Sequence, residues 1–425
     1  MLDLTMVNNQ CLSLFGIIVR ANRLNRRFTL REMAKKSMIS HTLLNKVEQG
    51  QTTITSDTYQ KITHAFAVDF SMDASKDLVF AEQERKIYDA IYYAEPQKAN
   101  EAFERIHQDE KYYLTSLNMI DYMIVAVAVY SHIQFKGMEA IVPFVQTLSS
   151  VIDLANETQK RRFYLFRAMH HFMNQDPELV KKDIQYVLDL NHDEVNESLA
   201  RYILARAQGY LHEIVQSNNN YHRAIYLFEQ NNNLRRSVYC KTFVAINNMK
   251  IYQFNDVMDD LSLALRYATR EKLDWLDFVI RMHMVIFEML HGQYEKALLL
   301  ANDIEFKNIR YYCLVAYSAI QINNRSVYEK ALKAADKSHK PYDKYHVFDH
   351  AIRFLAILGN RDQYSDSDYE KALKTFYEAT IKGHEFFEME VAFEHYKAFL
   401  VERRRYKDAY RLTNEIITLV KKTIQ

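Results

Sequence analysis

The sequence of 425 residues is too long for one small domain and predicts two or more structural units. With 48% hydrophobic and 26% charged residues it is typical of a globular protein, and seven glycines and four prolines leave little room for the turns of a β-rich fold. We therefore expect an all-α protein. Residues 1–70 carry nine Lys and Arg against five Asp and Glu, whereas the rest carries 46 against 49. A basic face is thus expected only near the N-terminus.

The sequence contains no feature of an exported or membrane protein. The first ten residues, MLDLTMVNNQ, lack the cationic start and apolar core of a secretory signal. The longest apolar run, at residues 122–130, is about half the length that a membrane-spanning helix needs. Cys11, Cys240 and Cys313 are scattered and odd in number, which argues against a disulfide framework. We expect a cytoplasmic protein without a membrane segment.

Residues 12–27 predict an amphipathic helix with apolar residues on one side and arginines on the other. The arginines suit the phosphate groups of nucleic acid; they are Arg20, Arg23, Arg26 and Arg27. A solvated basic face explains any single one equally well. As a cluster beside the next segment, they favour phosphate binding.

Residues 29–50, TLREMAKKSMISHTLLNKVEQG, predict two short helices around a tight turn. Ser40 suits the N-cap of the second helix, Gly50 suits its left-handed end, and Ala34 is small where the helices must approach. An ordinary helical hairpin would not need these features in register. The outward residues His41, Thr42, Asn45 and Lys46 can reach base edges, because Asn pairs with adenine and Lys with guanine. Thr29 and Gln51, at the two ends of the segment, are further candidates for DNA contacts.

The same residues carry a resemblance. Phe28-Thr29, Met33-Ala34, Ile39-Ser40 and Val47-Glu48-Gln49-Gly50 resemble the helix-turn-helix of the phage-repressor-like (Xre/Cro) family. Two positions depart from its pattern, since Met38 replaces a glycine in the turn and Leu30 replaces a glutamine that would contact DNA. The resemblance implies a helix-turn-helix DNA-binding domain over residues 1–70.

A polar stretch at residues 71–84, which we predict to be a linker, precedes a repeated pattern. An Ala-like residue opens an apolar stripe every 33 to 44 residues, at Ala102, Ala140, Val180, Ala224, Val257, Ala297, Ala331, Ala372 and Ala409. Residues 85–425 therefore predict an α-solenoid of about nine helix pairs, with Ser217 to Asn220 as a loop insertion. His291 to Leu298, HGQYEKAL, resembles the tetratricopeptide repeat at its turn and second helix, which implies a right-handed solenoid.

Stacked pairs of this kind leave a concave surface along their first helices. In tetratricopeptide domains this groove binds extended peptides, whose backbone groups need hydrogen-bonding partners. Candidates on the expected first helices are Tyr239, Thr242, Asn247, Asn248, Arg281, Asn323 and Arg353. For each of them a position on the outer face or in a loop is the alternative.

Catalytic motifs are limited to near misses. His212-Glu213 and His384-Glu385 lack the second histidine of a zinc-protease helix, and no glycine-rich phosphate loop is present. We expect no enzyme activity, no cofactor and no metal.

The order of head and repeats, over essentially the whole chain, resembles the peptide-pheromone-sensing regulators of Gram-positive bacteria, the group that includes Rgg, PlcR, PrgX and NprR. The resemblance implies a homodimer, formed through the repeat domain and often swapped through the head, that binds double-stranded operator DNA. It also implies quorum sensing, in which a short extended signalling peptide fills the groove and changes transcription. The alternative is a repeat domain that docks a protein partner, such as a response regulator.

Overall fold

The computed structural model describes residues 9–66, 73–134, 138–190, 193–338 and 346–424. Helices make up 81% of the structure, and the described residues contain no strand. The chain divides into two compact units, residues 1–203 and 204–425. None of the described helices is both long and apolar enough to cross a bilayer.

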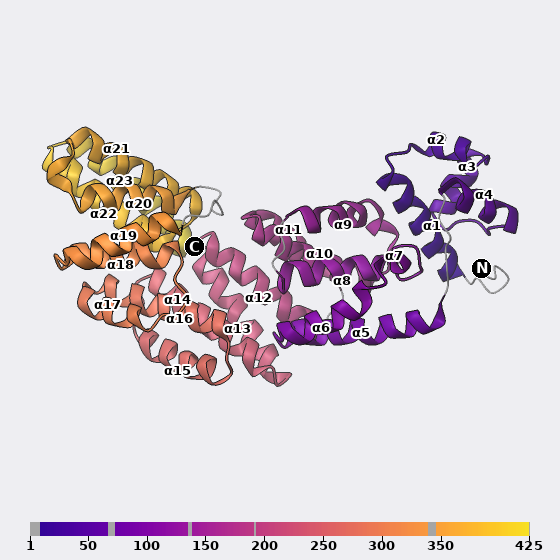
Figure 1. Cartoon of the computed structure of the whole chain (residues 1–425), viewed down its shortest axis with the longest axis horizontal. Coiled ribbons are helices and arrows are strands. Elements are labelled where there is room, and N and C mark those ends of the chain that lie inside the picture. The colour runs from indigo at the N-terminus through magenta and orange to yellow at the C-terminus, as the bar shows by residue number, and fades with distance from the viewer. Residues whose placement is uncertain (1–8, 67–72, 135–137, 191–192, 339–345, 425) are drawn as a thin grey trace. The chain divides into compact units, whose positions relative to one another are not determined.

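The first unit begins with four helices, called the head here: α1 (Asn9–Asn25), α2 (Leu30–Lys36), α3 (His41–Glu48) and α4 (Ser56–Phe66) (Figure 1). Thr29 and Glu32 cap α2 reciprocally, and Ser40 caps α3 by accepting a hydrogen bond from the backbone N–H of Leu43. Gly50 adopts a φ of 65°, as its place after α3 predicts. Met38, in the turn, adopts a φ of 52° that glycine tolerates better.

Helix α1 is the centre of the head. It contacts α3 and α4, and its buried residues Ile17 and Ile18 join Met33, Leu44 and Val47 in the core. Gly16 allows the closest approach, because a Cβ there would overlap the carbonyl oxygen of Val47 in α3. The predicted spacing of apolar residues thus produces a three-dimensional core that depends on one glycine.

In the part of the chain that the structure describes, the repeats form nine helix pairs, which confirms the predicted fold class. The first unit contains the pairs α5 (Ala74–Tyr92) with α6 (Pro96–His107), α8 (Met119–His132) with α9 (Met138–Val151), and α10 (Glu157–Met173) with α11 (Pro177–Asp189). The short α7 (Glu110–Tyr113) lies between the first two pairs in the sequence. Helix α5 begins inside the segment predicted as a linker, and the predicted domain boundaries stay a prediction.

Six more pairs follow, the first of which begins just before the division between the units. They are α12 (Glu194–Tyr210) with α13 (Ile214–Gln230), α14 (Leu234–Lys250) with α15 (Val257–Arg270), α16 (Asp274–Leu290) with α17 (Tyr294–Asn302), α18 (Ile309–Gln321) with α19 (Arg325–Lys337), α20 (Val347–Leu358) with α21 (Asp366–Gly383), and α22 (Phe386–Glu402) with α23 (Tyr406–Ile424). The predicted loop at Ser217–Asn220 is wrong, because these residues lie inside α13.

A recurring turn explains how so few glycines suffice. In most pairs the second residue after the first helix adopts a positive φ; these residues are Ala94, Gln175, His212, Tyr252, Gly292, Asn323 and Arg404. Only Gly292 among them is a glycine. The turn thus gives seven first helices a common register from which equivalent positions can be counted.

The second unit closes on itself. Helix α13, in its first pair, contacts α23, in its last pair. The first helices α14, α16, α18 and α20 each contact the next one in this series. Side chains of α18 and α22, two first helices that are not neighbours, also meet in this unit.

Candidate nucleic-acid interface and inner face of the repeats

The four residues predicted to contact bases lie together on the solvent-exposed face of α3. His41, Thr42, Asn45 and Lys46 are exposed, whereas Leu44 and Val47 on the opposite side are buried. His41 and Asn45, like Thr42 and Lys46, are four residues apart and so occupy neighbouring positions on one helical face. Amide, ammonium and methyl groups on an exposed helix of this kind match the groups that base pairs present in the major groove.

Two further candidates flank this face. Gln51 is exposed directly after Gly50. Thr29 is also exposed, but its hydroxyl donates to the Glu32 carboxylate at 2.8 Å and accepts from the Glu32 N–H at 3.2 Å. Thr29 therefore has a capping function that it performs without DNA.

The four arginines of the head have different surroundings. Arg23 corrects the sequence interpretation most clearly, since it is 9% exposed and its guanidinium bonds to the Glu48 carboxylate at 2.6 and 2.8 Å. Its third nitrogen donates to the carbonyl oxygen of Phe28 at 2.9 Å. We therefore remove Arg23 from the phosphate-binding set.

The other three arginines remain at the surface to different degrees. Arg20 is half-buried and pairs with Asp153 at 3.2 Å, between the head and the 3-10 turn after α9. Arg26 is exposed, donates to the carbonyl oxygen of Phe66 and lies 5.5 Å from the centre of its ring. Arg27 is exposed beside it in a left-handed conformation. Arg26 and Arg27 are thus the arginines best placed for a backbone phosphate.

The inner face of the second unit is identified by contacts between α18 and α22, which are two pairs apart. Arg310 of α18 bonds to Glu388 of α22 at 2.8 Å, and Tyr317 lies 3.2 Å from His395. Counting back thirteen and nine residues from the left-handed turn residue gives equivalent positions one helical turn apart. The position thirteen residues before the turn residue holds Tyr239 in α14 and Arg310 in α18. The position nine residues before it holds Phe243, His283 and His395. These side chains therefore face the same side.

An aromatic cluster lies at this face, formed by Tyr239 and Phe243 of α14, Trp275 of α16 and Arg206 of α12. The rings of Tyr239 and Trp275 stack with centroids 5.8 Å apart, and Phe243 is 6.2 Å from Trp275. The Arg206 guanidinium lies 5.8 Å from the Phe243 ring and 6.0 Å from the Trp275 ring. Trp275 remains 48% exposed, so the cluster offers a flat apolar surface with a positive charge beside it.

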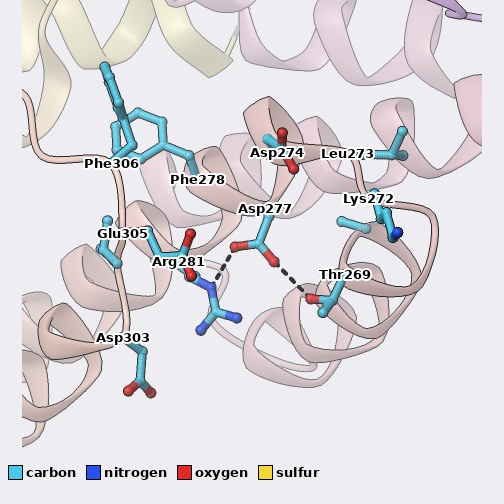
Figure 2. Close-up of a pocket in the computed structure, with 12 residues that line it drawn as sticks. Thr269, Lys272, Leu273, Asp274, Asp277, Phe278, Arg281, Asp303, Glu305 and Phe306 are labelled. Atoms are coloured by element: carbon cyan, nitrogen blue, oxygen red, sulfur yellow. Dashed lines mark hydrogen bonds and ion pairs between the residues drawn. The ribbon is translucent and has the colours of Figure 1, made fainter.

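A pocket of about 270 Å³ lies between the end of α15, the start of α16 and the segment after α17. Figure 2 shows Asp277 between Thr269 and Arg281; it accepts hydrogen bonds from them at 2.7 and 2.6 Å. Arg281 lies two positions from each of the two inner positions of α16. Side chains two positions apart on an α-helix point about 200° away from each other, so Arg281 points away from the inner face. This pocket is therefore not part of the inner face.

Comparison with known proteins adds to this geometry. Residues 19–72 match the helix-turn-helix family HTH_3. The N-terminal part of the chain therefore contains a helix-turn-helix domain. In this helix-turn-helix, α2 and α3 are the two motif helices, and α3 presents the exposed polar face described above. No curated protein matches the chain.

The repeats resemble solved structures in fold. A Rap protein in complex with competence and sporulation factor has 14% sequence identity and a TM-score of 0.64, over 82% of this chain and 99% of that one. The quorum sensor NprR from B. thuringiensis in its apo form has 14% identity and a TM-score of 0.59, and NprR with its cognate peptide NprX has 15% and 0.62. Each NprR match covers 82% of this chain and 100% of the other. The helix-turn-helix is thus joined to a helical repeat fold shared with these proteins.

The structure disperses the predicted peptide-binding residues. Tyr239 lies on the inner face, but Asn323 is the left-handed residue of the turn after α18 rather than part of a first helix. Arg353 is exposed on α20, and Arg281 lines the pocket of Figure 2. Thr242 is buried, and its hydroxyl donates to the carbonyl oxygen of Val238 at 2.9 Å.

Asn247 and Asn248 belong to a polar network between α13 and α14. The Asn247 amide donates to the Ser217 hydroxyl at 2.8 Å and to Asn218 Oδ1 at 2.9 Å, while Asn218 donates to Asn248 at 3.1 Å. Asn247 is 3% exposed. Its amide group is buried and bonded within the protein, which argues against a peptide contact for Asn247.

Sequence reasoning missed Trp275, Phe243 and Arg206. Trp275 is the single tryptophan of the chain, and its exposure is what marks the surface. The missing signal was the register. Phe243 and His283 both lie nine residues before the left-handed turn residue that follows their helix. Counting from these turns would have placed Phe243 on the inner face.

Proposed function

We propose that the protein is a cytoplasmic transcription regulator that binds operator DNA as a homodimer and is controlled by a short peptide on the inner face of its repeats. The observation that carries this proposal is the union, in one chain, of an exposed recognition helix with a repeat coil whose inner face exposes an aromatic cluster. A single small head makes few base contacts, so useful affinity requires two heads on adjacent half-sites.

The aromatic cluster supports a peptide rather than a nucleic acid. Residues 71–425 are nearly balanced in charge, which gives little net electrostatic attraction for a phosphate backbone. Stacked rings with one face exposed instead offer apolar area for side chains of an extended chain. The likeness to NprR, whose solved structure contains its cognate peptide, supports the same proposal.

The DNA part is tested by selecting sites for the full chain from random duplexes. We expect an inverted repeat with half-sites about one helical turn apart. Lys46→Ala should weaken binding to the selected site, whereas Lys333→Ala, which removes an exposed lysine from α19, should not. Equal affinity of the Lys46→Ala protein for the site would remove α3 as the recognition helix.

The peptide part is tested by selecting binders of the full chain from a random heptapeptide library. Selected peptides should change the affinity for the operator, and Trp275→Ala should lose them. The matched control is Tyr226→Ala, which removes a 54% exposed aromatic ring from α13. Peptides that bind the Trp275→Ala protein equally well, or an empty selection, would instead favour repeats that dock a protein partner.

A further inference from the structure

Residues His384–Glu388, which join α21 to α22 and form the first turn of α22, contact several first helices of the second unit. Its rings approach the ends of two first helices, since His384 lies 4.9 Å from Tyr210 and Phe386 lies 6.2 Å from Tyr252, measured between ring centroids. Phe387 is buried in the hydrophobic core formed by α14 to α18. The segment thus contacts parts of the coil that lie far apart in sequence, as a bound peptide would.

The segment also supplies negative charge to buried cations. Glu388 accepts two hydrogen bonds of 2.8 Å from Arg310, and Glu385 lies 3.4 Å from the same guanidinium. Burial lowers the pKa of Arg310, but Glu388 and Glu385 outweigh this effect and raise it above its usual value. Arg310 occupies an inner position equivalent to Tyr239 of the aromatic cluster.

Lys250, at the end of α14, is the second cation of this site. Its Nζ donates to the carbonyl oxygen of Gly209 at 2.8 Å. Burial lowers the pKa of Lys250 to about 8, while Glu385 partly offsets that effect. His283 lies near both cations and is uncharged at neutral pH, because burial, Arg310 and Lys250 lower its pKa to about 3. At this site α14, α16 and α18 therefore present Lys250, His283 and Arg310, which are positive or neutral. The carboxylates come from Glu385, the N-cap of α22, and from Glu388 in its first turn.

An ion pair in this position contributes little net stability, because the cost of desolvation offsets the attraction between the charges. It does impose a chemical preference on whatever occupies the site. The site is also reachable, since a quarter of the Arg310 side-chain surface and 27% of that of Glu385 are exposed. A carboxylate from another chain could take the position of Glu388 without a change in the cations.

We propose that Lys250 and Arg310 form a carboxylate-binding site on the inner face, that His384–Glu388 occupies it as an internal stand-in, and that the ligand is an acidic peptide with an adjacent aromatic or apolar residue. The ligand binds by displacing the Glu385 and Glu388 side chains from these cations. The inference rests on the proposed function, because it names the class of peptide that the inner face takes.

The test uses the full chain and an acetylated, amidated hexapeptide with the sequence of residues 384–389, HEFFEM. Its counterpart has glutamine in place of both glutamates. The tethered segment competes at high effective concentration. Glu388→Gln weakens this competitor, and we expect it to raise affinity for the acidic peptide about tenfold or more and to make that affinity clearly higher than the affinity for the glutamine peptide. Adding Arg310→Met should cancel the gain, and Glu394→Gln, on the exposed side of α22, should produce none.

The result that would overturn the inference is equal binding of the two hexapeptides to the Glu388→Gln protein, or no gain over the unchanged protein. If Glu388→Gln lowers the melting temperature too far, Glu385→Gln takes its place, because Glu385 is less buried. One result would refute this inference and leave the proposed function standing: library peptides bind and require Trp275, but the two hexapeptides show no difference in affinity between the unchanged and Glu388→Gln proteins. An empty library selection together with indifferent hexapeptides would refute both.

Discussion

The carboxylate of Glu48 accepts two hydrogen bonds from the guanidinium of Arg23, and both side chains are almost completely buried between α1 and α3. Breaking a buried pair of this kind leaves one charge without its partner, which costs about 3–5 kcal/mol. We expect Arg23→Met to increase hydrogen exchange of the α1 and α3 amides in the full chain. The salt dependence of DNA binding by the remaining folded protein should keep its slope, because no phosphate contact is lost. A flatter slope would return Arg23 to the phosphate-binding set.

Gly16→Ala should destabilise the same interface without changing any charge. The added methyl group would overlap the backbone of Val47, and a backbone atom cannot rotate away as a side chain can. Overpacking of this kind costs about 1–3 kcal/mol. Protection of α1 against hydrogen exchange would report the loss, and Ser56→Ala, at the exposed start of α4, is a control for general effects on the head. Unchanged protection would mean that α1 can shift without penalty.

Asn45→Ala separates base reading from general attraction. If Asn45 contacts an adenine, its loss should cost roughly 1–3 kcal/mol on the selected operator and little on random DNA. Arg27→Ala should instead weaken binding to both DNAs alike and reduce the salt slope by about one. Titrations at two or more salt concentrations distinguish the two patterns. Equal losses for Asn45→Ala on both DNAs would remove it from the base-reading residues.

Asn247→Ala should lower stability whether or not a peptide is present. The variant leaves the Ser217 hydroxyl and the Asn218 side-chain oxygen of α13 without their donor, and an unsatisfied buried polar group costs about 1–3 kcal/mol. The melting temperature of the full chain should fall in its second-unit transition. Asn219→Ala is a suitable comparison within the same run of α13. A normal melting temperature would show that water replaces the lost amide group.

Acid should weaken the second unit through its buried histidines. Burial lowers the pKa of His212 and His283 to about 3 and that of His395 to about 4. The unfolded chain therefore binds protons that the folded chain does not, and stability falls as pH drops from about 6.5 towards 4. Each of these half-buried histidines should contribute on the order of 1–2 kcal/mol of this loss by pH 5. Melting His283→Gln beside the unchanged protein at pH 7.5 and 5 isolates one contribution, which should disappear in the variant.

Local signals in the sequence predicted the head well. Ser40, Gly50 and the capping residue Thr29 act within a few residues of themselves, so their function can be inferred without the fold. The partner of Arg23 could not be inferred in this way. Glu48 is 25 residues away, and only the packing of α3 on α1 brings the two charges together. An arginine cluster in sequence thus divided into one buried pair and several surface groups.

The repeats show the same division. The Ala-like positions predicted the number of pairs, because each of them reports the contact between two adjacent helices. The asparagine-rich stretch in α13 was wrongly predicted to be a loop because it is polar. The side-chain amide group of Asn218 in this stretch finds its hydrogen-bonding partners in Asn247 and Asn248 of α14. The charged inner site could not be predicted, because Arg310 and Glu388 are 78 residues apart and meet only when the coil closes.

The contact of α13 with α23 gives the second unit a different mode of unfolding from that of an open row of repeats. In an open row each repeat touches only its neighbours, so the terminal ones fray first and the loss spreads inward. Here the last pair also packs against the first. Unfolding of the last pair therefore removes packing contacts from both ends of the array. We therefore expect a destabilising substitution in α23 to lower the stability of α13 as well, and the helix pairs of the second unit to unfold together.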